Sequence, residues 1–402
     1  MNEDLADFLL AAPGRILLDE AHALRESRAE TLTALTRLRR SATSEQASAA
    51  WVMTELRQRG QTKFGPDAAR MYFVREALEQ ASGAATAAYH ARRIAAAGVV
   101  EVADLGGGIG GDALAFARAG LFVVLIEHDP IRVRFALENV QVSGFSERVQ
   151  VVASNGTSLK INPDSALWLD PARRRDSRRI SDPEKYSPPL SWLHSLAAPT
   201  IGVKLSPAID HKLADDFQAE LEFVSERGEC REALLWKGKA QSGDKLRATL
   251  LTEDTALSLS GKADVPGSGA LKQSGAFLYE PDPAVIRAHL VGTLAARIGA
   301  ELMDPHIAYL LGTTLKQTPF ATGYEVLEQM QYSPKRLQAA LTSLDAGRLI
   351  VKKRGFPLEP SAVRMLFKLK GSREITLILA RVGSGHQAFL CVPLMSITRM
   401  GK

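Results

Sequence analysis

The sequence has only two cysteines among its 402 residues, Cys230 and Cys391. Two thiols exclude a disulfide framework and a metal site built from cysteines. No apolar run approaches the roughly 20 residues that span a bilayer. Glu3, Asp4 and Asp7 precede the first short apolar run, where a signal peptide would be basic. These features predict a cytoplasmic protein without a resident metal site.

The chain also has little excess of charge of either sign. Fifty Lys and Arg stand against 45 Asp and Glu, which gives a net charge of +5, and the charged fraction of 24% is that of an ordinary globular chain. The length allows two or three domains with a sizeable core. If the surplus positive charges are spread thinly over the surface, they indicate no particular partner, whereas a cluster of them would suit a polyanionic partner such as RNA.

Strand-like alternation is missing from residues 1–98, and proline occurs there only at Pro13 and Pro66. Ala, Leu, Arg and Glu dominate, so this region is predicted to be helical, with one helix over residues 67–82. Two short motifs stand out in it, Lys-Phe-Gly-Pro at 63–66 and Glu-Gln-Ala-Ser at 79–82.

From residue 99 the pattern changes to short apolar runs that alternate with amphipathic stretches. This alternation predicts an α/β domain over residues 99–260, with right-handed βαβ units and a Rossmann-like parallel sheet covered by helices. Residues 221–225 and 233–237 are compatible with an antiparallel edge. The expected strands are 99–105, 122–126, 149–153, 166–169 and 200–205, with helices at 111–119 and 130–143.

Residues 261–275 are rich in Gly, Ser, Ala and Lys and are predicted to be a linker. Residues 276–402 then mix both periodicities, which predicts a second, α+β domain. Its expected helices are 283–300, 334–346 and a stretch near 361–367, and its expected strands are 349–353 and 374–382. No internal repeat is present.

Six residues with five glycines follow the first predicted strand of the α/β domain. The match to G-x-G-x-x-G over residues 106–111 is weak by itself. Glycines in this place let the backbone turn and approach a ligand ahead of a helix N-terminus. Gly106, Gly108 and Gly110 are therefore predicted to bind either a dinucleotide or S-adenosylmethionine.

Acidic residues on both sides of this loop bear on the choice of cofactor. Asp104 and Asp112 would repel a pyrophosphate but tolerate a cationic sulfonium. Glu127, at the tip of the second strand, is placed to take ribose hydroxyls, which fits NAD equally well. Asp129 is expected to cap the next helix. Asn155 is a candidate for the adenine edge, with a simple turn residue as the alternative.

These motifs resemble a bacterial group of class I S-adenosylmethionine-dependent methyltransferases that carry a C-terminal THUMP-like domain. The group is distantly similar to RNA cap guanine-N2 methyltransferases (trimethylguanosine synthases). The resemblance covers the chain from about residue 63 onward and implies S-adenosylmethionine as cofactor. It implies an RNA partner by analogy, because THUMP domains accompany RNA-modifying enzymes. The matching stretches are 104–112, 127–130, 169–174, 204–207, 278–283 and 353–357.

In class I enzymes that methylate exocyclic amines, the fourth strand ends in Asp or Asn, two prolines and an aromatic residue. Asp170 and Pro171 match the acid and the first proline, which accept hydrogen bonds from the amine. Ala172 and Arg173 replace the second proline and the aromatic residue, so amine methylation is less firmly implied than by a full motif. Asp170 as a plain turn residue is the alternative. Stacking on the base would pass to one of three side chains: Arg173, Trp168 or Tyr186.

Five arginines occupy seven positions beside this motif. Guanidinium groups bind phosphate in a bidentate fork, so the cluster predicts a phosphate clamp. A solvated loop or ion pairs with nearby acids are the alternatives. The predicted substrate-binding residues are Arg173, Arg174, Arg178, Arg179 and Lys204, with Arg175 in the same cluster. Lys204 is also expected to extend the basic surface, together with Lys352, Lys353 and Arg354.

The sequence therefore predicts an S-adenosylmethionine-dependent methyltransferase that acts on an RNA base nitrogen. The altered residues after Pro171 allow a second reading, a non-catalytic RNA-binding protein that keeps the fold. A nicotinamide-dependent oxidoreductase is a third, but no Lys/Tyr or His/Asp pair stands at spacings that would support hydride transfer. The oligomeric state is not predicted.

Overall fold

The computed structural model describes residues 1–156, 162–171, 182–252, 255–264 and 274–394, and the backbone of 174–175 and 178–179. The chain forms two compact units. Unit 1 comprises residues 1–219 and 234–242, and unit 2 comprises residues 220–233 and 243–402. The predicted domain boundaries, which differ from this division, stay predictions. Most of the predicted linker, residues 265–273, lies outside the described residues.

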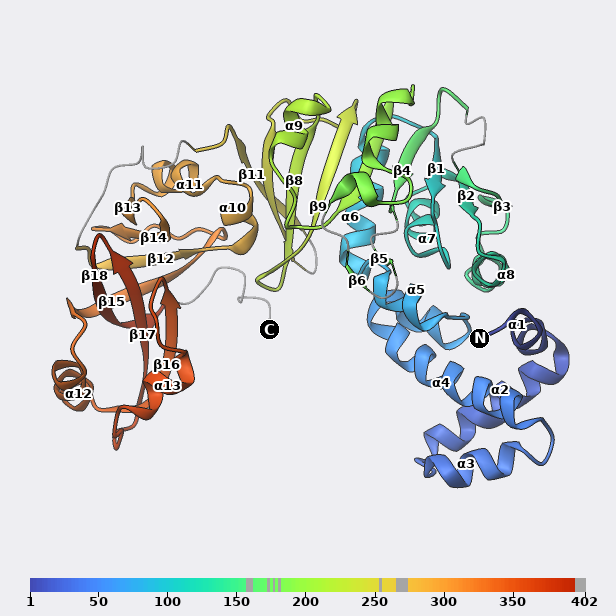
Figure 1. Ribbon diagram of the computed structural model, residues 1–402, viewed down its shortest axis with the longest axis horizontal. Coiled ribbons are helices and arrows are strands. Elements are labelled where there is room, and N and C mark those ends of the chain that lie inside the picture. The colour runs from blue at the N-terminus through green and yellow to red at the C-terminus, as the bar shows by residue number, and fades with distance from the viewer. Residues whose placement is uncertain are drawn as a thin grey trace. The chain divides into compact units, whose positions relative to one another are not determined.

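Unit 1 begins with helices, as predicted (Figure 1). Side chains cap two of them: the Asn2 side chain accepts from the Leu5 N–H at the first helix, and Thr43 and Gln46 form a capping box at the fourth. Among the residues that the structure describes, no helix is long and apolar enough to span a bilayer. The helices are α1 (Glu3–Leu10), α2 (Ala12–Glu26), α3 (Thr31–Leu38), α4 (Ser44–Phe64), α5 (Arg75–Gln80) and α6 (Ala84–Ala96), with a 3₁₀ turn at Gly65–Ala69.

The single helix predicted over residues 67–82 is wrong. Only α5 lies in its second half, and buried Tyr72 and Phe73 occupy a non-helical stretch before it. The backbone of Tyr72 pairs with a side chain instead: its N–H donates to Asn139 Oδ1 at 2.7 Å, and Asn139 Nδ2 donates to its carbonyl at 3.0 Å. These tertiary hydrogen bonds replace the intrahelical ones that the local sequence favours.

The sheet of unit 1 confirms the predicted α/β class. Its hydrogen-bonded neighbours follow the order β9, β7, β4, β1, β2, β3, and the pairs among β7, β4, β1, β2 and β3 are parallel. The order reverses between β1 and β4, where open α/β sheets bind ligands beyond the carboxyl ends of their strands. The elements are β1 (Glu101–Leu105), α7 (Gly111–Arg118), β2 (Phe122–Glu127), α8 (Pro130–Val142), β3 (Val149–Ala153), β4 (Ala166–Leu169), β7 (Thr200–Leu205), α9 (Lys212–Asp216) and β9 (Glu229–Gly238).

Unit 2 starts with strands that the sequence predicted only in part. β8 (Glu220–Glu226) neighbours β9, which contributes its first five residues to this unit. β10 (Leu246–Leu251) pairs in parallel with β8, and β11 (Ala256–Gly261) pairs antiparallel with β10. The pair predicted from residues 221–225 and 233–237 is therefore adjacent but is not the sheet edge.

A seven-stranded sheet fills the rest of unit 2, in the order β13, β14, β12, β15, β18, β17, β16. The helix predicted over residues 283–300 is broken, because His289 takes a left-handed φ of 54° between two shorter helices. The elements are β12 (Phe277–Pro281), α10 (Pro283–Arg287), α11 (Val291–Ile298), β13 (Glu301–Asp304), β14 (Ile307–Gly312), β15 (Ala321–Gln331), α12 (Pro334–Ser343), β16 (Ala346–Arg354), α13 (Pro360–Met365), β17 (Arg373–Val382) and β18 (Gly385–Pro393).

Candidate active site

The glycine loop turns between β1 and α7 with a shape that depends on glycine. Gly110 caps α7 at a φ of 94°, a left-handed conformation that other residues rarely adopt. A Cβ on Gly107 would lie 2.6 Å from Leu125 Cγ. The backbone N–H groups of Gly106 and Gly107 donate to the Ile126 carbonyl at 2.9 and 3.2 Å. The loop is thus pinned to the carboxyl end of β2.

Glu127 extends this attachment at the last position of β2. Its Oε2 accepts from the Gly108 N–H at 3.0 Å, and its Oε1 accepts from the N–H groups of His128 and Asp129 at 2.8 and 2.9 Å. Asp129 caps α8, as predicted, by accepting from the Arg132 N–H. Asn155 follows β3 and is exposed. Glu127 and Asn155 therefore stand at the carboxyl ends of neighbouring strands.

Asp104 lies in β1 with only 1% of its surface exposed. Among the described residues its Oδ2 has no hydrogen-bond partner. Burial, together with the charges of Asp112, Asp170 and Glu127, raises the pKa of Asp104 well above its ordinary value. An unpartnered buried carboxylate oxygen costs free energy. A cationic ligand group at the loop would remove that cost, which fits a cofactor with an ammonium and a sulfonium.

Asp112, in the first turn of α7, is buried but fully engaged. Its Oδ1 lies 3.0 Å from Nδ1 of the buried His90, and its Oδ2 accepts from the Ser82 hydroxyl at 3.2 Å. Burial alone would raise the pKa of Asp112, but His90, Lys204 and Ser82 together lower it to about 2. The His90 ring also packs on Trp168, with ring centroids 4.4 Å apart.

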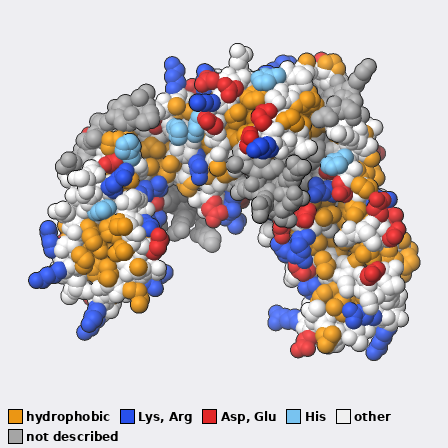
Figure 2. All heavy atoms as spheres, in the orientation of Figure 1, with side chains coloured by type: hydrophobic (Ala, Val, Ile, Leu, Met, Phe, Trp, Pro, Cys, Tyr) orange, Lys and Arg blue, Asp and Glu red, His pale blue; other side chains and the backbone are white. Residues whose placement is uncertain are grey.

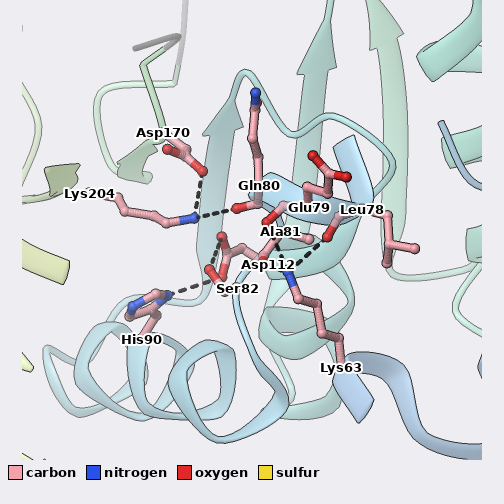
Figure 3. Close-up of polar contacts among 10 residues, drawn as sticks. All are labelled: Lys63, Leu78, Glu79, Gln80, Ala81, Ser82, His90, Asp112, Asp170 and Lys204. Atoms are coloured by element: carbon pink, nitrogen blue, oxygen red, sulfur yellow. Dashed lines mark hydrogen bonds and ion pairs between the residues drawn. The ribbon is translucent and has the colours of Figure 1, made fainter. Parts of the chain in front are cut away.

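Asp170 directly follows β4, next to the glycine loop. Its Oδ2 lies 2.7 Å from Lys204 Nζ, which also donates to the Gln80 carbonyl at 3.2 Å (Figure 3). The Lys204 side chain is only 5% exposed, against 23% for Asp170. Lys204 therefore does not extend an exposed basic surface as the sequence suggested, and a role in substrate binding stays a prediction for it.

The arginine cluster is described only in part. Arg174, Arg178 and Arg179 belong to a small antiparallel pair, β5 (Arg174–Arg175) and β6 (Arg178–Arg179), but their side chains lie outside the described residues. Arg173 and Ala172 lie outside them altogether. The phosphate clamp thus stays a prediction.

The prediction that a substrate base stacks on Trp168 or Tyr186 is wrong. Trp168 is fully buried among His90, Phe116 and Trp236, and Tyr186 is 3% exposed. Pro171, beside Asp170, is buried as well.

Three residues of this region were not predicted from the sequence: Lys63, Ser82 and His90. All come from the helical N-terminal region. Lys63 and Ser82 belong to the two short motifs noted in the sequence, but nothing in the spacing of these motifs indicates that they meet. His90 gives no local signal, because a lone histidine in a helix is usually a packing residue.

Comparison with known proteins identifies the family. Residues 321–393 match the model of the THUMP domain-like family, and residues 3–60 match a domain of unknown function, DUF8688. The chain is 33% identical over 363 residues to a protein of Mycobacterium tuberculosis described as an S-adenosylmethionine-dependent methyltransferase. The match covers 86% of this chain and 97% of the relative. The chain belongs to the S-adenosylmethionine-dependent methyltransferases. The same protein from a second strain gives the same match.

A solved structure supports the fold. It is described as a candidate methyltransferase from Porphyromonas gingivalis, and it superposes with a TM-score of 0.75 over 94% of this chain and 98% of its own, at 22% identity. The protein is therefore a methyltransferase-fold enzyme that uses S-adenosylmethionine, and the nicotinamide reading of the glycine loop is excluded.

Proposed function

We propose that the protein transfers a methyl group to an amine nitrogen of an RNA base, with Asp170 and Pro171 as the hydrogen-bond acceptors. The observation that carries this proposal is the position of Asp170. The Asp170 N–H donates to the Leu105 carbonyl at 3.4 Å. A Cβ on Gly106 would lie 3.3 Å from the Asp170 carbonyl oxygen. The acceptor motif and the cofactor loop are thus in direct contact.

The chemistry requires little beyond placement. S-adenosylmethionine supplies a methyl group that is already activated on a sulfonium. The Asp170 carboxylate and the Pro171 carbonyl accept hydrogen bonds from the two amine N–H groups, so that the nitrogen lone pair keeps one direction. The amine proton that methylation displaces leaves to solvent after the transfer. Holding the amine in one orientation is an entropic contribution that does not need a strong base.

The cofactor residues divide into two sets in this proposal. Gly106, Gly108 and Gly110 shape the loop, while three polar side chains contact the cofactor: Asp104 at its amino-acid moiety, Glu127 at the ribose and Asn155 at the adenine. Asp112 acts indirectly, since its oxygens contact the side chains of His90 and Ser82 from the helical N-terminal region. Its negative charge still favours a cationic ligand at the loop.

The distribution of charge supports RNA as the acceptor. Residues 321–393 contain eleven Lys and Arg against five Asp and Glu, whereas the rest of the chain has 39 against 40. The whole basic surplus thus lies in the THUMP-like region, and Lys and Arg side chains project from the surface near α12 and α13 (Figure 2). Such clustering suits a phosphate backbone. The arginines at positions 173–179 would add to it beside Asp170.

The decisive experiment measures transfer of tritium from methyl-labelled S-adenosylmethionine to total RNA from a strain that lacks the gene. We expect incorporation that RNase removes, and digestion to nucleosides should place the label on a base. Asp170→Ala should reduce the rate by about a hundredfold or more, while leaving the affinity for S-adenosylhomocysteine unchanged.

Other outcomes are equally informative. Label in a protease-sensitive fraction would overturn the RNA substrate and leave the methyltransferase activity in place. Binding of RNA without any transfer to RNA, protein or small molecules would favour the non-catalytic reading.

A further inference from the structure

Residues 78–82, which we call the bridging segment, comprise the end of α5 and the residues that follow it in unit 1. They contact both Lys204, the partner of Asp170, and Asp112 at the start of α7 (Figure 3). At one end, the Ser82 hydroxyl donates to Asp112, in the first turn of α7. Near its middle, the Gln80 carbonyl accepts from Lys204, which also pairs with Asp170. Asp170 Oδ2 and the Gln80 carbonyl are within about 6 Å of each other, because both contact the same nitrogen.

Lys63 fixes the bridging segment from the other side. Its Nζ donates to three carbonyls, those of Leu78, Glu79 and Ala81, at 2.7, 3.1 and 2.6 Å. Two ammonium groups therefore hold the carbonyls of four consecutive residues at the end of α5. Cations in this place are favourable, because a helix leaves its last carbonyls without partners and carries partial negative charge there.

The segment also packs against the start of α7. A Cβ on Gly111 would lie 3.6 Å from the Ala81 methyl and 3.7 Å from the Phe64 ring, so the space beside the cofactor helix is filled by the two N-terminal motifs. The N-terminal region is thus in contact with both halves of the site.

We propose that Lys204 is a positioning residue and that the bridging segment holds the Asp170 carboxylate in a fixed place relative to the cofactor helix. This inference rests on the proposed role of Asp170 as the acceptor of the amine. Lys204 carries the connection through charge-assisted hydrogen bonds, which are shorter and more directional than neutral ones. Lys63 acts one step further away, by keeping the Gln80 carbonyl where Lys204 reaches it.

The test compares three variants of the full-length protein, Lys204→Met, Lys204→Arg and Lys63→Met, with Lys185→Met as a matched control. Lys185 forms an exposed pair with Asp182 at 3.6 Å, so its loss removes a lysine–aspartate contact that includes no residue of this network. The methyl acceptor is an unfractionated lysate of a strain lacking the gene, which contains RNA, protein and small molecules. Calorimetry with S-adenosylhomocysteine measures cofactor binding separately.

We expect Lys204→Met to lower the rate at saturating cofactor by about a hundredfold and Lys63→Met by about tenfold, the size typical of a misplaced reacting group. The dissociation constant for S-adenosylhomocysteine and the KM for S-adenosylmethionine should stay within about threefold of wild type in both variants. Lys204→Arg should recover a large part of the rate, because a guanidinium can still bond both oxygens. Lys185→Met should match wild type.

Two results would overturn the inference while leaving the proposed function intact. One is full activity of Lys204→Met and Lys63→Met alongside loss of activity in Asp170→Ala. The other is equal loss of rate and cofactor affinity in Lys204→Met and Lys204→Arg, which would mean that the ion pair serves folding only. Full activity of Asp170→Ala would instead refute the proposed function, and the bridging role with it.

Discussion

The two ends of the glycine loop each carry a buried acid, but the acids are held differently. Asp112, on the helix side, has a partner for each oxygen and a pKa lowered to about 2. Asp104, on the strand side, has an oxygen without a partner among the described residues and a raised pKa. The first arrangement stabilises the protein by itself. The second is unfavourable until a ligand arrives, which is the signature of a binding group.

The largest expected effect is a loss of protein stability when the paired acid, Asp112, is removed. Asp112→Ala leaves His90 buried without its carboxylate, so the free energy of unfolding of unit 1 should fall by about 3 kcal/mol. Fluorescence in urea measures this unit alone, because all four tryptophans, at 51, 168, 192 and 236, belong to it. A loss below about 0.5 kcal/mol would show that the buried pair contributes nothing net.

The next effect concerns binding, and it should appear at the other acid. Asp104→Asn removes a carboxylate that a cationic ligand would need, so the dissociation constant of S-adenosylmethionine should rise by about thirtyfold, or about 2 kcal/mol. The same change removes an unfavourable buried charge, and the free energy of unfolding should stay equal or increase. Calorimetry and urea unfolding together test this opposition. Loss of stability without loss of binding would reverse the roles given to the two acids.

The raised pKa of Asp104 predicts a direction for the pH dependence of binding. A proton must leave Asp104 before the carboxylate pairs with a cation, so affinity for S-adenosylmethionine should increase as the pH rises toward that raised pKa. Below that pKa, the dissociation constant should rise by up to about tenfold for each unit by which the pH falls. S-adenosylhomocysteine, which lacks the sulfonium charge, should show a smaller slope. Both ligands carry the ammonium group that Asp104 is proposed to bind, so Asp104→Asn should flatten the pH dependence for both, and an unchanged pH dependence would argue against direct pairing.

The smallest effect should come from another acid near the loop, Asp129. Its side chain caps α8, so Asp129→Ala should cost about 1 kcal/mol of stability and leave cofactor affinity unchanged. Asp129→Ser keeps a capping oxygen and serves as the control. Weakened cofactor binding in Asp129→Ala alone would show that the capped helix also orders the glycine loop.

The sequence pattern predicts the parallel sheet of unit 1 well, because short buried strands are followed by clear turn and cap signals. β3, β4 and β7 have the predicted bounds, and α8 begins at the predicted Pro130. Much of unit 2 was not predicted, including β10 to β15 and β18. These strands are amphipathic or short and pair with distant segments, so local periodicity gives little indication of them.

The residues of the candidate site also divide into those that the sequence predicts and those that it does not. Residues on the carboxyl ends of β1, β2 and β4 follow from strand order alone, since parallel strands meet at one edge. The partners of Asp112 and Lys204 do not, because His90, Ser82 and Gln80 come from a region whose packing on the sheet depends on tertiary contacts. The failed helix at residues 67–82 shares this cause: Asn139, far along the chain, decides the local backbone at Tyr72.

The route of the chain through its two units has a consequence for how the protein is made. Unit 1 receives its last strand segment, residues 234–242, only after residues 220–233 of unit 2 have been synthesised. On the ribosome, β8 therefore emerges before unit 1 is complete and must wait for β10 to arrive. A gene fragment that ends at residue 219 encodes an unfinished sheet, and one that starts at residue 243 lacks β8. No single cut in the gene therefore yields both units with all of their strands.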